Sequence, residues 1–513
     1  MRCAVAAGDG LSAEHPYIPD MNTIHFPFEN SYGRLPERFY TRLSPTAVTA
    51  PQSIIVNPGV ARSLGLDADT LTTEAATRVF AGNAVPDGAD PLAMAYAGHQ
   101  FGHFVPQLGD GRAILLGEIV DRDGVRQDIH LKGAGRTPYS RGGDGRAALG
   151  PVLREYIVSA HMHALGIPTT RALAAVTTGE AVYRDDVLPG AVLTRVAASH
   201  LRIGTFEYFT ARRDAEAVKT LIDYAIDRHY PDIDKGAGAA AALLEGVLRR
   251  QSSLVAKWLS VGFIHGVMNT DNTSISGETI DYGPCAFIDT YRPDKVFSSI
   301  DTGGRYAFMN QPAVLQWNLG QLAECLLPFI DERQETAVGV AQDIIDGFPD
   351  IFSEDMRRAF ARKLGLNEQA PDAMAMALSL LEVMAEQKAD FTLTFRNLAE
   401  AIGDDDRADA FLGQFEEPGA VGEWLNRWRA RVIEDNESAD IAQARLNAAN
   451  PAVIARNHLV EAVIRAAEDR SDYAPLHEMM EVVEAPFADQ PPGSRYVRPP
   501  QPGEEVMKTF CGT

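Results

Sequence analysis

The chain has few cysteines, only four in 513 residues, and none of them forms a Cys-x-x-Cys pair. This scarcity excludes a disulfide scaffold, gives no zinc signature and is typical of a reducing compartment. No apolar run approaches the roughly 18 residues that a membrane helix needs. The first twenty residues hold one Arg, a short apolar run and acids, which fits neither a secretory signal nor a transit peptide. We therefore expect a cytoplasmic protein without a membrane partner.

Positive charge is also scarce, because 47 Lys and Arg residues face 70 Asp and Glu residues and the formal net charge is -23. Such a charge repels nucleic-acid backbones and anionic lipid, so we expect no nucleic-acid partner. Against this background the glycine-rich loop 133–145 is conspicuous, since it carries Arg136 and Arg141 and is followed by Arg146. Apolar residues make up 45% of the chain. Its length exceeds what one core usually supports, which predicts two lobes.

The residue composition changes several times along the chain, and the chain contains no internal repeat. Met21 precedes the first segment rich in aromatic residues, so the residues before it read as an upstream start or a loose tail. We expect five segments: a tail at 1–20, a mostly helical leader at 21–98, a strand-rich lobe at 99–212, a helical lobe at 213–484, and a Pro-rich arm at 485–513 that ends in Cys-Gly-Thr.

The strand-rich lobe begins at a tight turn, Gly109-Asp110-Gly111-Arg112, which feeds an apolar run of strand length. A second strand follows, in which Ile129 and Leu131 alternate with polar residues and place Lys132 on the opposite face. An apolar stripe after Pro151 then predicts a helix that stops at Gly166, with Glu155 away from the stripe and facing solvent or a polar group. Residues 172–196 again read as strands.

The second half has helical periodicity, with helices expected at 215–230, 237–261, 312–329, 421–436 and 440–468. Between the second and third of these lies the loop 262–284. In it Asp271 and Asn272 are adjacent, and Asp281 precedes Tyr282-Gly283. Mg²⁺ takes oxygen ligands and is usually held by one or two such side chains together with nucleotide phosphates. The loop therefore predicts a metal and nucleotide site with one carboxylate to spare.

A hairpin with a Gly turn, a strand lysine, a helix glutamate and a later Asp-Asn loop are the parts of a protein-kinase-like fold. We therefore predict an α+β bilobal protein with a β-containing N-lobe and a large helical C-lobe. The motif residues differ from those of kinases at each point: His265-Gly266 stands in place of His-Arg-Asp, and Asp281-Tyr282-Gly283 in place of Asp-Phe-Gly. Asp271 and Asn272 are adjacent in the sequence, whereas kinases separate the catalytic base from the metal ligand. This adjacency argues against ordinary kinase chemistry.

Four separated stretches resemble the selenoprotein O family, protein nucleotidyltransferases long taken for pseudokinases, and nearly the whole chain from Met21 takes part. The stretches are 109–113, Leu131-Lys132-Gly133-Ala134-Gly135-Arg136-Thr137-Pro138-Tyr139-Ser140-Arg141, His265-Gly266-Val267-Met268-Asn269-Thr270-Asp271-Asn272, and Asp281-Tyr282-Gly283-Pro284. The ending Cys511-Gly512-Thr513 is also similar to the family's, where some members carry selenocysteine. The chain thus resembles a bacterial, Cys-containing member.

The resemblance implies that ATP binds in an orientation reversed from that in kinases. AMP would then pass to Ser, Thr or Tyr hydroxyls of target proteins, with release of pyrophosphate. Asp271 would be the proton acceptor, Asn272 and Asp281 would hold Mg²⁺ or Mn²⁺, and Glu155 would pair with the strand lysine. The residues implied to contact the nucleotide are Gly109, Gly111, Arg112, Lys132, Asp144, Gly145, Arg195 and Arg202.

Other interpretations stay open. Taken singly, the glycines are turn residues, the Asp-Asn pair could cap a turn, and the two late arginines could be ordinary ion-pair partners. The alternatives for function are UMP transfer with Mn²⁺, γ-phosphoryl transfer by an ordinary kinase, and an inactive nucleotide-binding scaffold. We expect a monomer. No spacing favours Cys285 over Cys325 as a disulfide partner of Cys511.

Overall fold

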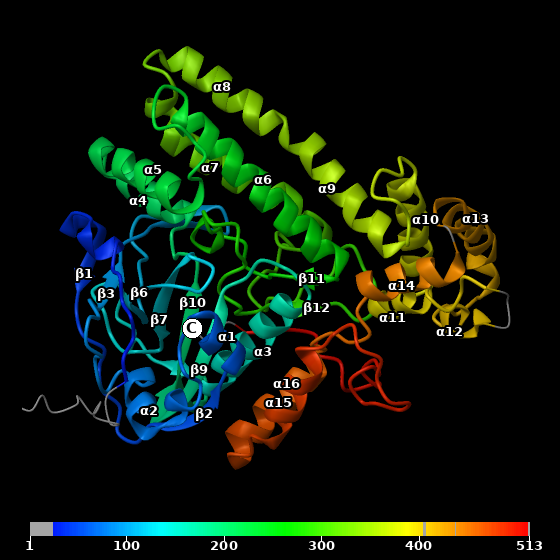
Figure 1. Ribbon diagram of the computed structural model, residues 1–513, viewed down its shortest axis with the longest axis horizontal. Coiled ribbons are helices and arrows are strands. Elements are labelled where there is room, and N and C mark those ends of the chain that lie inside the picture. Colours follow the sequence, from blue (N-terminus) through cyan, green and yellow to red (C-terminus); the bar gives the residue numbers. More distant parts are fainter. Residues whose placement is uncertain (1–23, 404–406, 437, 511–513) are drawn as a thin grey trace, which may run out of the picture.

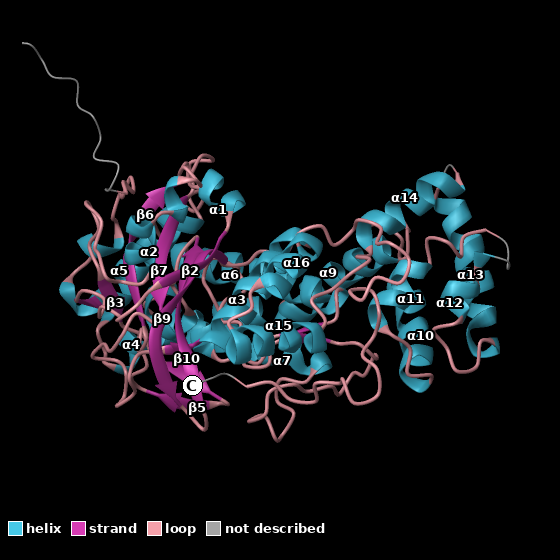
Figure 2. Cartoon of the chain, turned by 90° about the horizontal axis from the view of Figure 1, so that it is seen from below, coloured by secondary structure: helices cyan, strands magenta, loops and turns pink. Residues whose placement is uncertain are grey.

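The computed structural model describes residues 24–403, 407–436 and 438–510. The predicted tail at 1–20 and Cys511 lie outside the described residues. The main sheet lies toward one end of the molecule, and helices build most of the other end (Figures 1 and 2). The prediction of an α+β fold with a β-containing N-lobe and a helical C-lobe is confirmed.

The N-lobe is built on one eight-stranded sheet whose strand pairs are all antiparallel. Its order is β1-β3-β6-β7-β10-β9-β2, with β8 paired to β10. The strands are β1 (Tyr40–Arg42), β2 (Gln52–Val56), β3 (Leu92–Met94), β6 (Ala113–Val120), β7 (Arg126–Lys132), β8 (Ala147–Ala148), β9 (Arg171–Tyr183) and β10 (Val187–Ala197). The hairpin predicted around Lys132 is therefore present as β6 and β7. Its turn is closed by Asp121, whose side chain accepts hydrogen bonds from two backbone N–H groups.

The prediction of a mostly helical leader at 21–98 is wrong. Its helices α1 (Pro58–Ser63) and α2 (Glu74–Phe80) are short, and β1, β2 and β3 of this segment belong to the main sheet. These strands have three to five residues, which is too short for alternation to distinguish them from a loop. Strand β3 pairs with β6, β2 pairs with β9, and β1 pairs with β3, so each becomes a strand through a partner that comes later in the chain.

The helix predicted after Pro151 is α3 (Leu149–Ala164), which packs against β9, β10 and α15. The helices after the sheet are α4 (Ile203–Ala211), α5 (Ala215–His229), α6 (Ala239–Ser260), α7 (Gln311–Ile330), α8 (Gln334–Asp346), α9 (Phe348–Lys363), α10 (Ala373–Glu386), α11 (Phe391–Asn397), α12 (Asp409–Leu412), α13 (Gly419–Asp435), α14 (Ala439–Ala449), α15 (Asn457–Arg470) and α16 (Ala474–Val483). None of the described helices is long and apolar enough to cross a bilayer.

One predicted helix, 440–468, is in fact two. Asn450 ends α14 with an extended backbone, and α15 starts only at Asn457. Pro451 follows Asn450, and a proline disfavours the helical conformation of the residue before it. Periodicity continued across the break because apolar residues on both sides remain buried.

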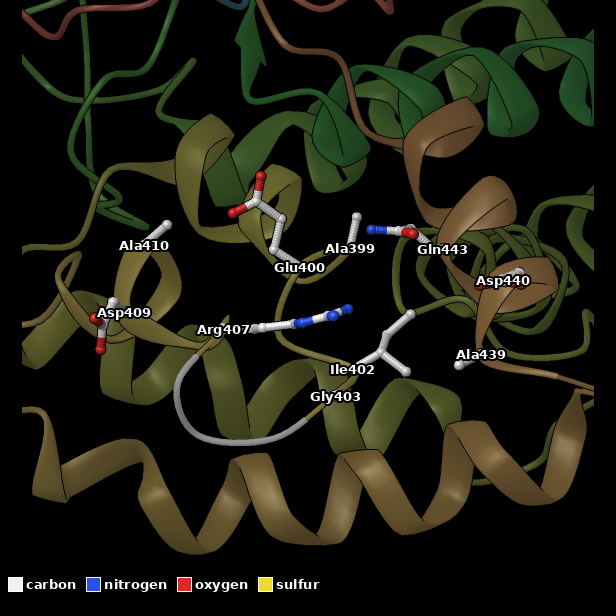
Figure 3. A pocket seen from close by; sticks show the side chains of 10 residues that line it. All are labelled: Ala399, Glu400, Ile402, Gly403, Arg407, Asp409, Ala410, Ala439, Asp440 and Gln443. Atoms are coloured by element: carbon white, nitrogen blue, oxygen red, sulfur yellow. The ribbon is translucent and has the colours of Figure 1, made fainter. Parts of the chain in front are cut away.

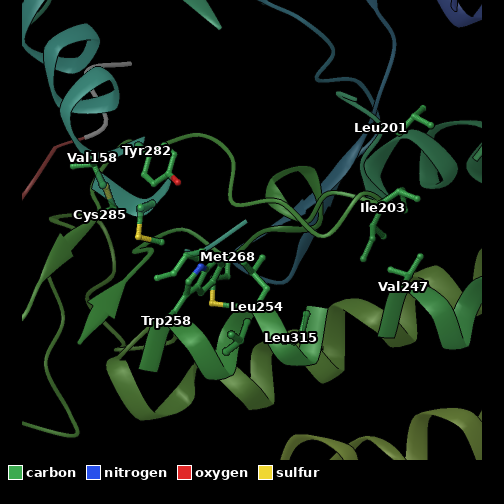
Figure 4. Close-up of a cluster of buried hydrophobic side chains, with 14 of the residues drawn as sticks. Val158, Leu201, Ile203, Val247, Leu254, Trp258, Met268, Tyr282, Cys285 and Leu315 are labelled. Carbon is green, nitrogen blue, oxygen red and sulfur yellow. The ribbon is translucent and has the colours of Figure 1, made fainter. Parts of the chain in front are cut away.

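A large buried cluster of apolar side chains joins the two lobes and supports the polar loop (Figure 4). Trp258 of α6 and Leu315 of α7 pack there with Met268, which lies within the loop, and with Tyr282, which follows Asp281. Both ends of the functional loop are therefore anchored in apolar core, which gives their polar neighbours a defined position.

Candidate active site

The loop that carries Asp271 and Asp281 is closed at its base by a short antiparallel ladder. β11 (Phe263–Ile264) pairs with β12 (Ala286–Phe287). Inside the loop, His265 is buried, and its Nε2 donates to Ile280 O at 2.8 Å. His265 thus holds the two halves of the loop together.

Asp281 is surrounded by three cationic side chains. Its Oδ1 accepts hydrogen bonds from Lys132 Nζ at 2.9 Å and Arg195 Nη2 at 2.6 Å, and its Oδ2 accepts one from Arg202 Nη1 at 3.0 Å. Burial opposes its ionisation, but Arg195, then Lys132 and Arg202, outweigh burial and hold the pKa of Asp281 well below its usual range. The backbone of Asp281 has φ 61°, a conformation that Asp tolerates better than most residues.

Glu155 of α3 completes this charge cluster, defined here as Lys132, Glu155, Arg195, Arg202 and Asp281. Its Oε2 accepts from Lys132 Nζ at 2.6 Å, and its Oε1 accepts from Arg195 Nε at 2.8 Å. The predicted pairing of the strand lysine with the helix glutamate is present in the structure. Strand β7, strand β10 and helix α3 each contribute one member, so the cluster lies where the sheet, α3 and the loop meet.

Arg202 connects the charge cluster to the Asp271 turn. It caps the N-terminus of α4, and its Nη1 donates to the backbone oxygen of Asp271 at 2.9 Å as well as to Asp281. Its guanidinium lies 4.4 Å from the ring centroid of Tyr96, a cation–π contact that adds to its fixation. Tyr96 was not among the predicted site residues.

Asp271 lies in a single 3₁₀ turn, Thr270–Asn272, and its residue is only 8% exposed. Its Oδ1 is buried without a hydrogen-bond partner in the described structure, while Oδ2 accepts from Gln100 Nε2 at 3.5 Å. Burial raises the pKa of the carboxyl to about 7. A buried carboxylate with an unused acceptor atom is suited to receive a proton near neutral pH.

The loop offers oxygen atoms that could hold a metal ion. Asn272 Nδ2 donates to Val267 O at 2.9 Å, which turns the amide oxygen away from that contact. Asn272 and Asp281 fit the small number of carboxylate and amide ligands that Mg²⁺ takes beside phosphates. Within residues 24–403, 407–436 and 438–510, no cluster of three or more His, Cys, Asp or Glu side chains could hold a metal by itself. A metal here would depend on the nucleotide for its remaining ligands.

Three glycines predicted to contact the nucleotide lie where neighbouring atoms leave no room for a side chain. A Cβ atom at Gly109 would lie 2.3 Å from the Tyr139 ring, and one at Gly111 would lie 2.9 Å from Tyr139 O. At Gly145, where φ is 71°, a Cβ would lie 2.1 Å from Gly135 O. These glycines pack the β6 entrance against the glycine-rich loop.

The two remaining residues that were predicted to contact the nucleotide are Arg112 and Asp144. Arg112 precedes β6, and its backbone oxygen accepts from Gly133 N at 2.7 Å. Asp144 pairs with Arg184 at 2.9 Å, so in this structure its carboxylate is engaged away from the charge cluster.

One hollow of the structure lies in the helical C-lobe, apart from this cluster. It has a volume of about 400 Å³ and lies between α12, α14 and the segment after α11, and Glu400, Arg407 and Asp440 are among the side chains at its wall (Figure 3). It shares no residue with the charge cluster or the Asp271 turn.

A family model described as protein adenylyltransferase SelO matches residues 22–484. The protein nucleotidyltransferase YdiU of Bradyrhizobium diazoefficiens is 58% identical over 491 residues, which is 96% of this chain and 100% of the relative. The protein of the same name from Rhodopseudomonas palustris is 56% identical over 491 residues, with the same coverage of both chains.

Proposed function

The chain belongs to the protein adenylyltransferase SelO family, and we propose that it transfers AMP from ATP to Ser, Thr or Tyr hydroxyls of target proteins. Pyrophosphate is the second product. The proposal is carried by one observation: Lys132, Arg195 and Arg202 all lie within 3.0 Å of a single carboxylate, that of Asp281. Such a concentration of buried cations is a preformed site for a polyanion.

The triphosphate would bind by exchanging partners with the carboxylates. In the described structure Glu155 and Asp281 occupy the donors of Lys132 and Arg195. Phosphate oxygens are equally good acceptors for these groups, and planar guanidinium groups bind them in bidentate fashion. Binding therefore needs small side-chain movements of a cluster that the sheet and α3 already hold in place.

The transfer step uses Asp271 as the proton acceptor. The oxygen of the target hydroxyl forms a bond to the α-phosphorus. The bond from that phosphorus to the oxygen bridging the β-phosphate breaks, and pyrophosphate leaves with the bonding electron pair. The hydroxyl proton passes to the Asp271 carboxylate, whose pKa of about 7 keeps a large fraction ionised at neutral pH. Lys132, Arg195 and Arg202 stabilise negative charge on the phosphate oxygens.

Asn272 and Asp281 would hold Mg²⁺ or Mn²⁺, which when bound would neutralise phosphate charge. The description of the matching family model, an adenylyltransferase, supports AMP transfer over γ-phosphoryl transfer. UMP transfer with Mn²⁺ by the same residues is the second candidate, since the charge cluster binds phosphates and does not by itself select a base.

Isotopic label tests the reaction. The purified chain is incubated with Mg²⁺, an acceptor protein and ATP labelled at either the α- or the γ-phosphate. We expect α-label, and no γ-label, in protein, together with an intact-mass increase equal to AMP. Competition by UTP, and α-labelled UTP with Mn²⁺, measure the base preference.

Two variants accompany this experiment. Asp281→Ala should abolish metal-dependent nucleotide binding and transfer, whereas Asp223→Ala, which removes an exposed partner of Lys219 on α5, should leave both unchanged. Incorporation of γ-label would identify a kinase instead. Metal-dependent ATP binding without any turnover would identify a scaffold.

A further inference from the structure

A small hairpin, separate from the main sheet, lies directly against the Asp271 turn. It consists of β4 (Gly98–Gln100) and β5 (His103–Val105), joined by Phe101 and Gly102. Phe101 has φ 53°, which is an outlier for a bulky residue. Backbone N–H of Phe101 donates to Asn269 Oδ1 at 3.1 Å, so the strained turn is held by the loop that it covers.

The contact between hairpin and turn is close along its length. A Cβ atom at Gly98 would lie 2.5 Å from Asp271 Oδ1, so only glycine lets the strand approach the carboxylate this closely. Tyr306 supports the contact from the other side, since its hydroxyl donates to Asn269 Oδ1 at 2.6 Å. The hairpin is thus a fixed part of the surroundings of Asp271.

Three residues from three elements lock this contact by a closed ring of hydrogen bonds. Thr270 Oγ1 donates to Glu207 Oε2 at 2.6 Å and accepts from His99 N at 2.7 Å. His99 Nδ1 lies 2.6 Å from Glu207 Oε1 and closes the ring. Glu207 belongs to α4, His99 to β4 and Thr270 to the turn, immediately before Asp271. We call this set the Glu207 ring.

Helix α4 carries both the Glu207 ring and a member of the charge cluster. Arg202 at its N-terminus contacts Asp281 and the backbone oxygen of Asp271, while Glu207 lies within the same helix and contacts Thr270. An α-helix is rigid over this length. It therefore sets the spacing between a cation of the phosphate site and the turn that carries the proton acceptor.

Stability alone gives a poor account of Glu207. Its side chain is 4% exposed, and its partners are a hydroxyl and an imidazole rather than a guanidinium or ammonium group. Burial raises the pKa of its carboxyl, which means that the surroundings disfavour its charge. Replacing a buried ion pair as a whole by apolar residues of similar volume is often neutral or stabilising. The role of this polar ring is therefore to fix the position of the turn that carries Asp271.

We propose that Glu207, acting through Thr270 and His99, positions the Asp271 carboxylate relative to the bound nucleotide. These are positioning residues, because none of them needs to touch a reacting atom. This inference rests on the proposed function, in which Asp271 is the proton acceptor. Breaking the Glu207 ring should therefore slow turnover selectively, since the charge cluster that binds phosphate remains intact.

Thr270→Val tests the inference, because valine keeps the shape of threonine and removes the hydroxyl. We expect kcat for AMP transfer to fall about 10²-fold, the effect of a misplacement near 1 Å, while the Kd for ATP stays within about twofold. Thr270→Ser keeps the hydroxyl and should retain kcat within about threefold of the wild type. Hydrogen exchange of residues 268–273 should be faster in the valine variant only.

A matched control is Thr394→Val in α11, which also removes a fully buried hydroxyl, one that donates to Asp390 O at 2.6 Å. We expect it to leave kcat unchanged. Should Thr270→Val fail to fold by circular dichroism, Glu207→Gln gives the same test, because it retains the size of the side chain and weakens the ring.

The outcomes are distinct. A kcat equal to that of the wild type in Thr270→Val, or equal loss in the valine and serine variants, would overturn the inference. Loss of ATP binding together with kcat would also overturn it, since this indicates general damage. Wild-type protein that transfers no nucleotide would refute the proposed function, and the inference with it.

Discussion

The charge cluster makes a quantitative prediction for Asp281→Asn in protein free of metal and nucleotide. Asparagine keeps the side-chain shape and tolerates the positive φ of 61° at this position, so the variant removes the charge and replaces one acceptor oxygen by an NH2 donor. Lys132 and Arg195 then keep Glu155 as their carboxylate partner, whereas Arg202 loses the carboxylate of the cluster that it contacts. The side chains of the two arginines are 2% and 3% exposed, so water compensates little.

Removing one partner of a buried ion pair costs about 3–5 kcal/mol. We expect about 3 kcal/mol, near the lower end, because Glu155 still pairs with two of the cations and the Asp281 side chain is itself 23% exposed. Tripolyphosphate should reverse this loss, since an anion can now occupy the vacated donors. At a concentration of about 100 times its Kd, it restores about 2.7 kcal/mol.

Urea denaturation in EDTA, with and without tripolyphosphate, measures both quantities. Asp223→Asn on α5, where the paired Lys219 is exposed, serves as the control and should change the unfolding free energy by less than about 0.5 kcal/mol. The reasoning fails if Asp281→Asn is as stable as the wild type. It also fails if tripolyphosphate stabilises the wild type more than the variant, because Asp281 would then not compete with phosphate.

Three further predictions concern single buried groups. Asp271→Ala should slow AMP transfer about 10²-fold or more with ATP binding retained, and lost binding in a filter assay would make Asp271 a metal ligand instead. Burial lowers the pKa of His161 to about 4 from 6.5, so its contribution to stability is present above pH 6.5 and is lost as pH falls. Between pH 8 and pH 5 the wild type should lose about 2 kcal/mol that His161→Asn does not lose, as measured by urea titrations at both pH values. Burial lowers the pKa of Lys363 to about 7 from 10.5, so the wild type should gain about 2 kcal/mol between pH 7 and pH 9, and Lys363→Met should show no such gain.

The fold was predictable where local pattern and tertiary environment agree. The β6–β7 hairpin follows from alternation and a turn, and α3, α5, α6 and α7 follow from long apolar stripes. The short strands β1, β2 and β3 were not predictable in this way, because pairing with distant partners decides their conformation. The break at Asn450 could have been found from the proline after it.

The site was predictable in its residue types and less so in its contacts. The Lys132–Glu155 pair was expected, and the structure contains it. The meeting of Arg195, Arg202 and Asp281 at one point was implied by resemblance alone, since no spacing in the chain relates β10 to the loop. The roles of these residues in nucleotide and metal binding stay predictions.

The sequence by itself determined the chemistry available to this protein. Its acidic composition leaves few cations, its loop holds an Asp-Asn pair and a further Asp, and its motifs identify a family. Only the tertiary structure decided that Asp271 is buried beneath the β4–β5 hairpin and that Glu207 holds the turn beside it. The physical reason is that hydrogen bonding and burial depend on distances between elements far apart in the chain. Local periodicity carries no information about those distances.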